Sequence, residues 1–83
     1  MKITLDKQCV KKALEAFKEC SSITQCCPVY QALKDAGIPV TEVSFTFFRT
    51  EENRKPLPKE AINITYLGSD QWHNIKTPIT FEI

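Results

Sequence analysis

The chain has 83 residues, a formal net charge of +1, 42% hydrophobic residues and 25% charged residues. This length predicts a single domain over residues 1–83, and the composition is that of a globular rather than a disordered protein. Basic and acidic residues are interspersed, which argues against a nucleic-acid partner and against an acidic DNA mimic. No apolar run approaches the roughly 20 residues of a membrane span, and the first residues lack a signal-peptide core. We therefore expect a cytoplasmic protein with no membrane partner.

The first quarter of the chain predicts a strand followed by a helix. Residues 2–5 alternate polar and apolar side chains, as a short strand does. Thr4 or Asp6 can then cap a helix that runs to about Cys20. The apolar positions of this helix recur with a 3.6-residue period: Cys9, Val10, Ala13, Leu14, Phe17 and Cys20.

A polar corner leads from this helix into a second one. Pro28 suits the first position of a helix, and Gly37 suits a left-handed cap that ends it. Cys27 would be the N-cap, where unpaired N–H groups and the helix dipole can lower a thiol pKa. The alternative interpretation is that Cys26 and Cys27 are small, inert fillers of the core, and we favour it.

Four cysteines raise the question of disulfides and zinc. On one continuous helix, Cys9 and Cys20 would stand about 16 Å apart, which is too far for a disulfide. Cys20 is geometrically able to pair with Cys26 or Cys27, although a reducing cytosol argues against a structural bridge. A zinc site would need Cys20, Cys26, Cys27 and His73. The chain has no CxxC pair, so we expect no metal.

An enzyme of this sequence would depend on a thiol. Cys27 is a weak candidate for a nucleophile, with His73 as its base and Asp70 as the group that orients the base. The two glycines are far apart and form no phosphate-binding loop. We therefore expect no cofactor and a non-enzymatic protein.

After Pro39 the pattern becomes that of a strand. Residues 40–50 are rich in β-branched and aromatic side chains and predict one continuous strand. Its alternation places Phe45 and Phe47 toward the core and leaves Phe48 on the opposite, exposed face. Phe48 is therefore a candidate binding residue.

The last third of the chain is less regular. Residues 51–58 predict a polar loop in which Arg54 and Lys55 are weak binding candidates. Residues 58–67 have a helical start and end but an alternating apolar pattern, and we favour the helix over the strand. In the irregular segment 69–77, Trp72 either packs on the sheet, which we favour, or is an exposed anchor for a partner. Residues 78–83 predict a final strand.

Several short motifs resemble those of a family. These are an initial MKIT, the helix start CPVxxAL at Cys27–Leu33, LPxEA at Leu57–Ala61 and the proline-led final strand PITFEI. They resemble a loose family of small, uncharacterised proteins encoded by bacteriophages and prophages. The resemblance implies a viral or mobile-element origin, hence a location in the host cytoplasm, and a helix at residues 58–67.

Together these features predict an α+β domain with two to three helices on one face of an approximately three-stranded antiparallel sheet. The function we favour is that of a host–virus protein-interaction module, which binds a host protein. An anti-CRISPR inhibitor of bacterial defence is an example of such a module. A homodimer is a further option for the same exposed surfaces. The alternatives are a thiol-dependent enzyme or redox sensor using Cys27, and a nucleic-acid-binding accessory module.

Overall fold

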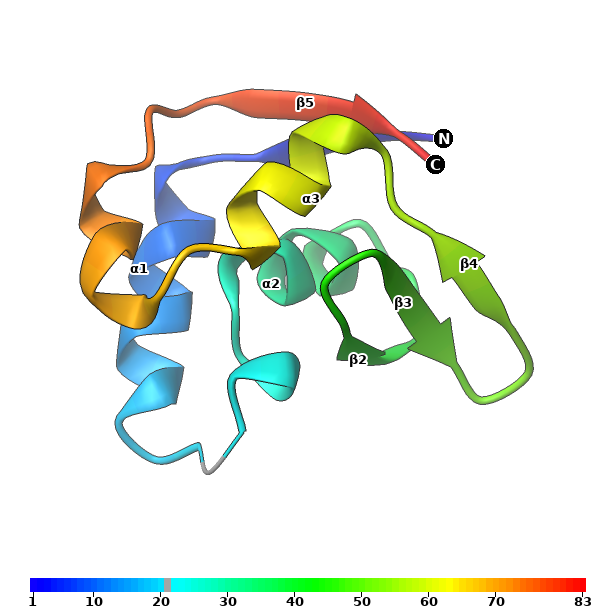
Figure 1. Cartoon of the computed structure of the whole chain (residues 1–83), viewed down its shortest axis with the longest axis horizontal. Coiled ribbons are helices and arrows are strands. Elements are labelled where there is room, and N and C mark those ends of the chain that lie inside the picture. Colours follow the sequence, from blue (N-terminus) through cyan, green and yellow to red (C-terminus); the bar gives the residue numbers. More distant parts are fainter. Residues whose placement is uncertain (21) are drawn as a thin grey trace.

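The computed structural model describes residues 1–20 and 22–83 as one α+β domain (Figure 1). Strands β1 and β5 pair as an antiparallel ribbon, and β2, β3 and β4 form a separate antiparallel sheet. The predicted fold class is confirmed, with more strands than expected. The elements in chain order are β1 (Lys2–Leu5), α1 (Lys7–Phe17), η1 (Ile23–Gln25), α2 (Pro28–Asp35), β2 (Val40–Val43), β3 (Phe47–Thr50), β4 (Arg54–Pro56), α3 (Lys59–Thr65), η2 (Ser69–Asn74) and β5 (Ile79–Glu82).

Helix α1 begins as the sequence predicts but ends earlier. The carboxylate of Asp6 accepts a hydrogen bond from the backbone N–H of Cys9 at 3.1 Å, which makes Asp6 the N-cap. The helix stops at Phe17 rather than near Cys20. Its last turn tightens, because the N–H of Glu19 bonds to a carbonyl only three residues back.

Helix α2 has the predicted caps at both ends. Cys27 is the N-cap, its Sγ accepts from a backbone N–H of the first turn, and Pro28 is the first helical residue. Gly37 has a φ of 86°, and the N–H of Ile38 donates to the carbonyl of Leu33 at 3.1 Å. This is a Schellman cap, for which glycine is the favoured residue.

The same helix lies at the centre of the core. The side chains of Val29, Ala32 and Leu33 are buried, and α2 contacts α1, β1, β2 and α3. On its exposed side, Asp35 forms a salt bridge with Lys12 of α1 at 3.0 Å. Such an exposed pair contributes little to stability, so apolar burial is what holds α2 in place.

The prediction of one strand over residues 40–50 is wrong. The chain reverses within it, so that β2 and β3 form a hairpin in which Val43 pairs with Phe48. The turn lies between Ser44 and Phe47, and the N–H of Ser44 donates to the carbonyl of Phe47 at 2.8 Å. The sequence SFTF lacks the Asn-Gly or Asp-Gly signal of most two-residue hairpin turns, which is why the reversal was missed.

This reversal exchanges the faces assigned to two phenylalanines. Beyond the turn the alternation restarts, so Phe48 points into the core and is 1% exposed. Phe45 lies in the turn itself and is 56% exposed. The expected burial of Phe45 and exposure of Phe48 are therefore both wrong.

The last third of the chain contains one more strand than predicted. Within the expected loop 51–58, Arg54–Pro56 pairs with β3 as strand β4. Residues 58–67, where both a helix and a strand were considered, contain the helix α3, as their helical start and end signals favoured. The final strand is also confirmed: β5 pairs with β1, with Ile3 opposite Phe81.

Trp72 packs in the core rather than serving as an exposed anchor. It lies in the 3₁₀ helix η2, is 0% exposed, and meets the ring of Phe17 edge-on at 5.5 Å between centroids. Its indole Nε1 has no hydrogen-bond partner in the described chain. The favoured alternative, packing, is thus confirmed, although the contact found is with α1 rather than with the sheet.

The central position of α2 predicts a large loss of stability when its core is truncated. Leu33→Ala should lower the free energy of unfolding by about 2–5 kcal/mol, because it removes buried methyl groups and leaves a cavity. Urea denaturation measures this loss, and Lys34→Ala on the exposed side of α2 is the matched control, with a change within about 0.5 kcal/mol. Equal losses in the two variants would contradict the burial of α2.

Candidate functional site

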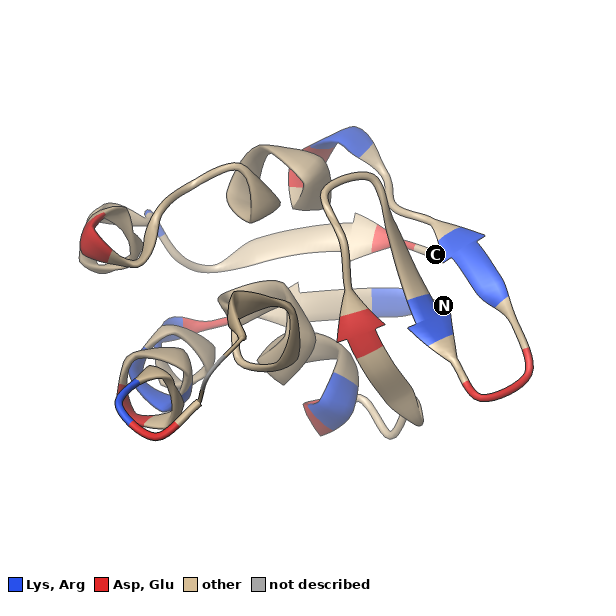
Figure 2. Ribbon diagram, turned by 60° about the horizontal axis from the view of Figure 1, so that its bottom comes forward, with Lys and Arg blue, Asp and Glu red and all other residues tan. Residues whose placement is uncertain are grey.

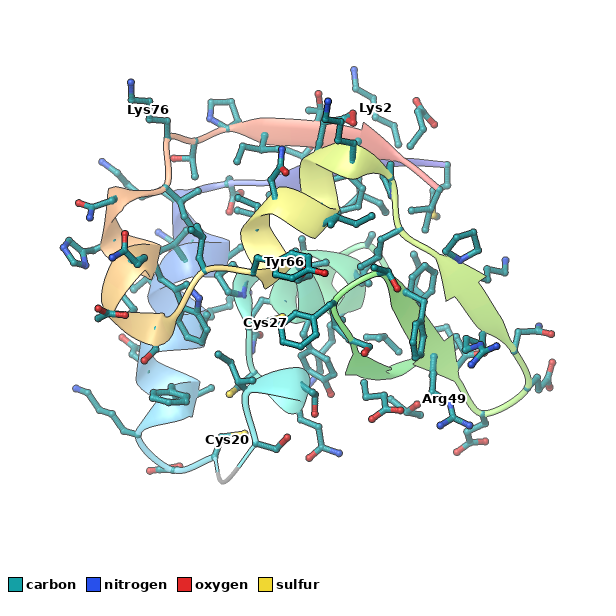
Figure 3. All side chains as sticks on the ribbon, viewed as in Figure 1. Lys2, Cys20, Cys27, Arg49, Tyr66 and Lys76 are labelled. Carbon is teal, nitrogen blue, oxygen red and sulfur yellow. The ribbon has the colours of Figure 1, made fainter. Side chains whose placement is uncertain are left out.

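Two aromatic side chains are stacked on the surface of the domain. Phe45 and Tyr66 are 56% and 63% exposed, with ring centroids 4.8 Å apart and an angle of 20° between the ring planes. Phe45 lies in the β2–β3 turn and Tyr66 caps the C-terminus of α3. The hydroxyl of Thr65 donates to the carbonyl of Phe45 at 2.7 Å, which ties the turn to α3. This bond anchors the backbone of the turn next to the end of α3, where Figure 3 labels Tyr66.

A small pocket adjoins this aromatic pair. Its volume is about 50 Å³, far below the roughly 300–1,000 Å³ of sites for drug-sized ligands. A pocket of this size accepts one small side-chain group. It is lined by Ile23, Thr24, Cys27, Val43, Ser44, Phe45 and Thr65.

The lining of the pocket offers mainly apolar surface. The hydroxyl of Thr65 is engaged by the carbonyl of Phe45, as described above. The hydroxyl of Thr24 shares a hydrogen bond with that of Ser22 at 2.6 Å. With these two hydroxyls paired internally, the lining offers a ligand mostly carbon atoms, together with the sulfur of Cys27 and the hydroxyl of Ser44. The pocket therefore favours an apolar group.

The environment of Cys27 does not activate its thiol. Burial raises the pKa of Cys27 to about 11, and this effect outweighs the backbone N–H groups of Tyr30 and Val29, which lower it. The Sγ accepts from the N–H of Tyr30 at 3.4 Å. The favoured interpretation of Cys27 as a buried, inert residue agrees with this environment, whereas the alternative of a lowered pKa does not, because desolvation of the thiolate is the larger effect.

The residues proposed to assist Cys27 are not assembled around it. Asp70 and His73 are exposed on η2, which packs against α1, whereas Cys27 lines the pocket beside β2 and α3. No hydrogen bond between Cys27 and either residue is found in the described structure. Residues 1–20 and 22–83 also hold no cluster of three or more metal-ligating side chains.

The predicted binding residues divide into buried and exposed ones. Phe48 is buried, so its expected exposure is wrong, and Trp72 is buried as favoured, so neither residue is an exposed anchor. Arg54 and Lys55 are exposed on β4, and the guanidinium of Arg54 lies 5.0 Å from the ring centroid of Phe47. The acidic loop before β4 lies beside these basic residues, and the acidic part of β2 is separated from them by β3 (Figure 2).

Phe45 and Tyr66 were not predicted as site residues. One signal for Phe45 was present: an uninterrupted strand over residues 40–50 is long compared with the usual five or six residues. Dividing that stretch into a hairpin would have placed Phe45 in a turn. Tyr66 immediately follows α3, but nothing in its sequence context indicates that it stacks on Phe45.

No helix in the described ranges combines the length and the apolar character that a membrane span requires. This agrees with the absence of a long apolar run in the sequence.

The raised pKa predicts slow alkylation of Cys27. In the native protein at pH 7.5, Cys27 should react with iodoacetamide about 100-fold more slowly than free cysteine, since so little thiolate is present. The rate should rise about tenfold per pH unit toward pH 11, where the thiolate forms. Peptide mapping by mass spectrometry measures each site, with Cys27→Ser as the control for assignment. A rate equal to that of free cysteine would contradict the prediction.

The chain was compared with protein-family models, curated proteins and solved structures. None of these comparisons finds a match. The resemblance to phage-encoded proteins therefore stays a prediction, and the function is argued from the geometry of the aromatic pair and its pocket.

Proposed function

We propose that the protein is a non-enzymatic interaction module that binds a host protein through Phe45, Tyr66 and the adjacent pocket. The observation that carries the proposal is the exposed, stacked aromatic pair. The phage-like motifs of the sequence give the context: an inhibitor of a bacterial defence system, such as an anti-CRISPR, acting in the host cytoplasm.

The exposure of the pair supports a binding role. Large aromatic side chains bury much apolar area when a partner covers them, and they are enriched at the energetic centres of interfaces. Most large apolar side chains of this domain are buried, including those of Trp72, Phe48 and Leu33. Among the large apolar side chains of the described residues, those of Phe45 and Tyr66 have the largest exposed fractions apart from the terminal Met1. Exposed neighbouring aromatics of this kind are typical of a partner-binding patch.

The anchoring of the pair also favours binding. Phe45 is held by the bond from Thr65 and by its stacking on Tyr66. A partner therefore loses less free energy in ordering these side chains than it would with mobile ones. The binding surface is preorganised by the fold.

The chemistry of the site indicates what kind of partner it would fit. The pocket accepts one small apolar side-chain group, with aromatic faces beside it. On the nearby β2–β3 surface, Arg49 and Glu42 neutralise each other in a salt bridge of 3.2 Å. We expect a partner protein that inserts an apolar side chain and whose association depends only weakly on salt.

The test is affinity capture of the tagged protein from bacterial lysate, with mass spectrometry of stoichiometric partners. Truncation of the aromatic pair by Phe45→Ala or Tyr66→Ala should weaken binding of the captured protein about 30-fold, as at an interface hot spot. Tyr66→Phe keeps the stacked ring and should bind as the wild type does. Lys11→Ala, on the exposed face of α1, is the control for a distant surface change.

Two outcomes would overturn the proposal. One is a partner whose affinity for Phe45→Ala and Tyr66→Ala equals its affinity for the wild type. The other is a homodimer, detected by light scattering, that Phe45→Ala dissociates. In that case the pair binds a second copy of the chain.

A further inference from the structure

The thiols of Cys20 and Cys26 converge on one backbone oxygen. The Sγ of Cys20 donates to the carbonyl of Ser22 at 2.8 Å, and the Sγ of Cys26 donates to the same oxygen at 3.2 Å. Two sulfurs this close to one atom are neighbours in space. Cys20 follows α1 (Figure 3), and Cys26 is the C-cap of η1.

We propose that Cys20 and Cys26 form a redox-controlled disulfide across this corner. The oxidant is a small-molecule disulfide such as oxidised glutathione. The Cys20 thiolate attacks one of its sulfurs, forms a mixed disulfide and releases one glutathione thiolate. The Cys26 thiolate then attacks the Cys20 sulfur, forms the Cys20–Cys26 bond and releases the second. The two protein thiols lose two electrons and two protons, which yield two molecules of reduced glutathione.

The accessibility of the two thiols determines the order of these steps. Cys20 is partly exposed, so a dissolved disulfide can reach it. Cys26 is 0% exposed, and burial together with the neighbouring Cys20 thiol raises its pKa to about 12. Cys26 therefore reacts slowly with solutes, but it lies where it can attack a sulfur already attached to Cys20.

The other two cysteines are directed elsewhere. The Sγ of Cys27 caps α2 by accepting from Tyr30 and lines the pocket. The Sγ of Cys9 lies 3.7 Å from a carboxylate oxygen of Asp35 on α2. These contacts select Cys26 as the partner of Cys20 over its neighbour Cys27.

The carbonyl of Ser22 is hydrogen-bonded in either redox state. The carbonyl of Ser22 also accepts from the N–H of Gln25 at 3.2 Å, so it keeps a partner when both thiol hydrogens are lost. Closing the disulfide would hold η1, whose Ile23 and Thr24 line the pocket beside Phe45. This coupling to the pocket rests on the proposed function, whereas the disulfide itself does not.

The test incubates the reduced full chain in glutathione buffers of increasing oxidised fraction, followed by acid quenching. Intact mass spectrometry should show a loss of about 2 Da, as expected for one intramolecular disulfide. N-ethylmaleimide should label four thiols under denaturing conditions before oxidation and two afterwards. This measurement needs no partner protein, so it is independent of the proposed function.

Matched variants assign the bond. Cys27→Ser keeps an N-cap oxygen and should oxidise as the wild type does, as should Cys9→Ala. Cys26→Ser should stop at a glutathione adduct on Cys20, and Cys20→Ser should form neither product. A Cys20–Cys27 bond, a disulfide between two copies, or only mixed disulfides in the wild type would each overturn the proposal.

Discussion

The burial of α2 is the constraint on which the rest of the structure depends. This helix has eight residues, too few to be stable in water without tertiary contacts. It is stable here because α1, β1, β2 and α3 pack around its apolar side chains. In so small a domain, the four elements that contact α2 are placed by the surface that it gives them.

The surface site follows from this arrangement. The β2–β3 turn and the end of α3 both belong to elements that pack on α2, and η1 leads directly into its N-cap. Their exposed ends meet beside Cys27, where the chain places Phe45 and Tyr66. Residues more than 20 positions apart in the sequence thus form one surface. That surface is apolar, whereas the charges around it are interspersed and partly paired (Figure 2).

Local signals in the sequence predicted the helices well. Pro28 and Gly37 have strong intrinsic backbone preferences, and they mark α2 because few other conformations suit them. The alternation of residues 2–5 and 78–83 likewise predicted the two strands of the ribbon. In these places the information is contained within a few neighbouring residues.

The candidate site was harder to predict because it depends on tertiary geometry. The turn at Phe45 uses ordinary residues in an ordinary backbone conformation, so the composition of the stretch is that of a strand throughout. The choice between Cys26 and Cys27 as a partner for Cys20 depends on which way each side chain points at the start of α2. Adjacent residues point in different directions there, and only the folded corner shows which one faces Cys20.

The buried indole of Trp72 gives the protein an internal optical probe. It is the only tryptophan in the chain, it has no contact with water, and its Nε1 lacks a hydrogen-bond partner among the described residues. An indole in such apolar surroundings emits at shorter wavelength than one in water. Because Trp72 joins η2 to α1 through Phe17, its emission reports the docking of these two elements.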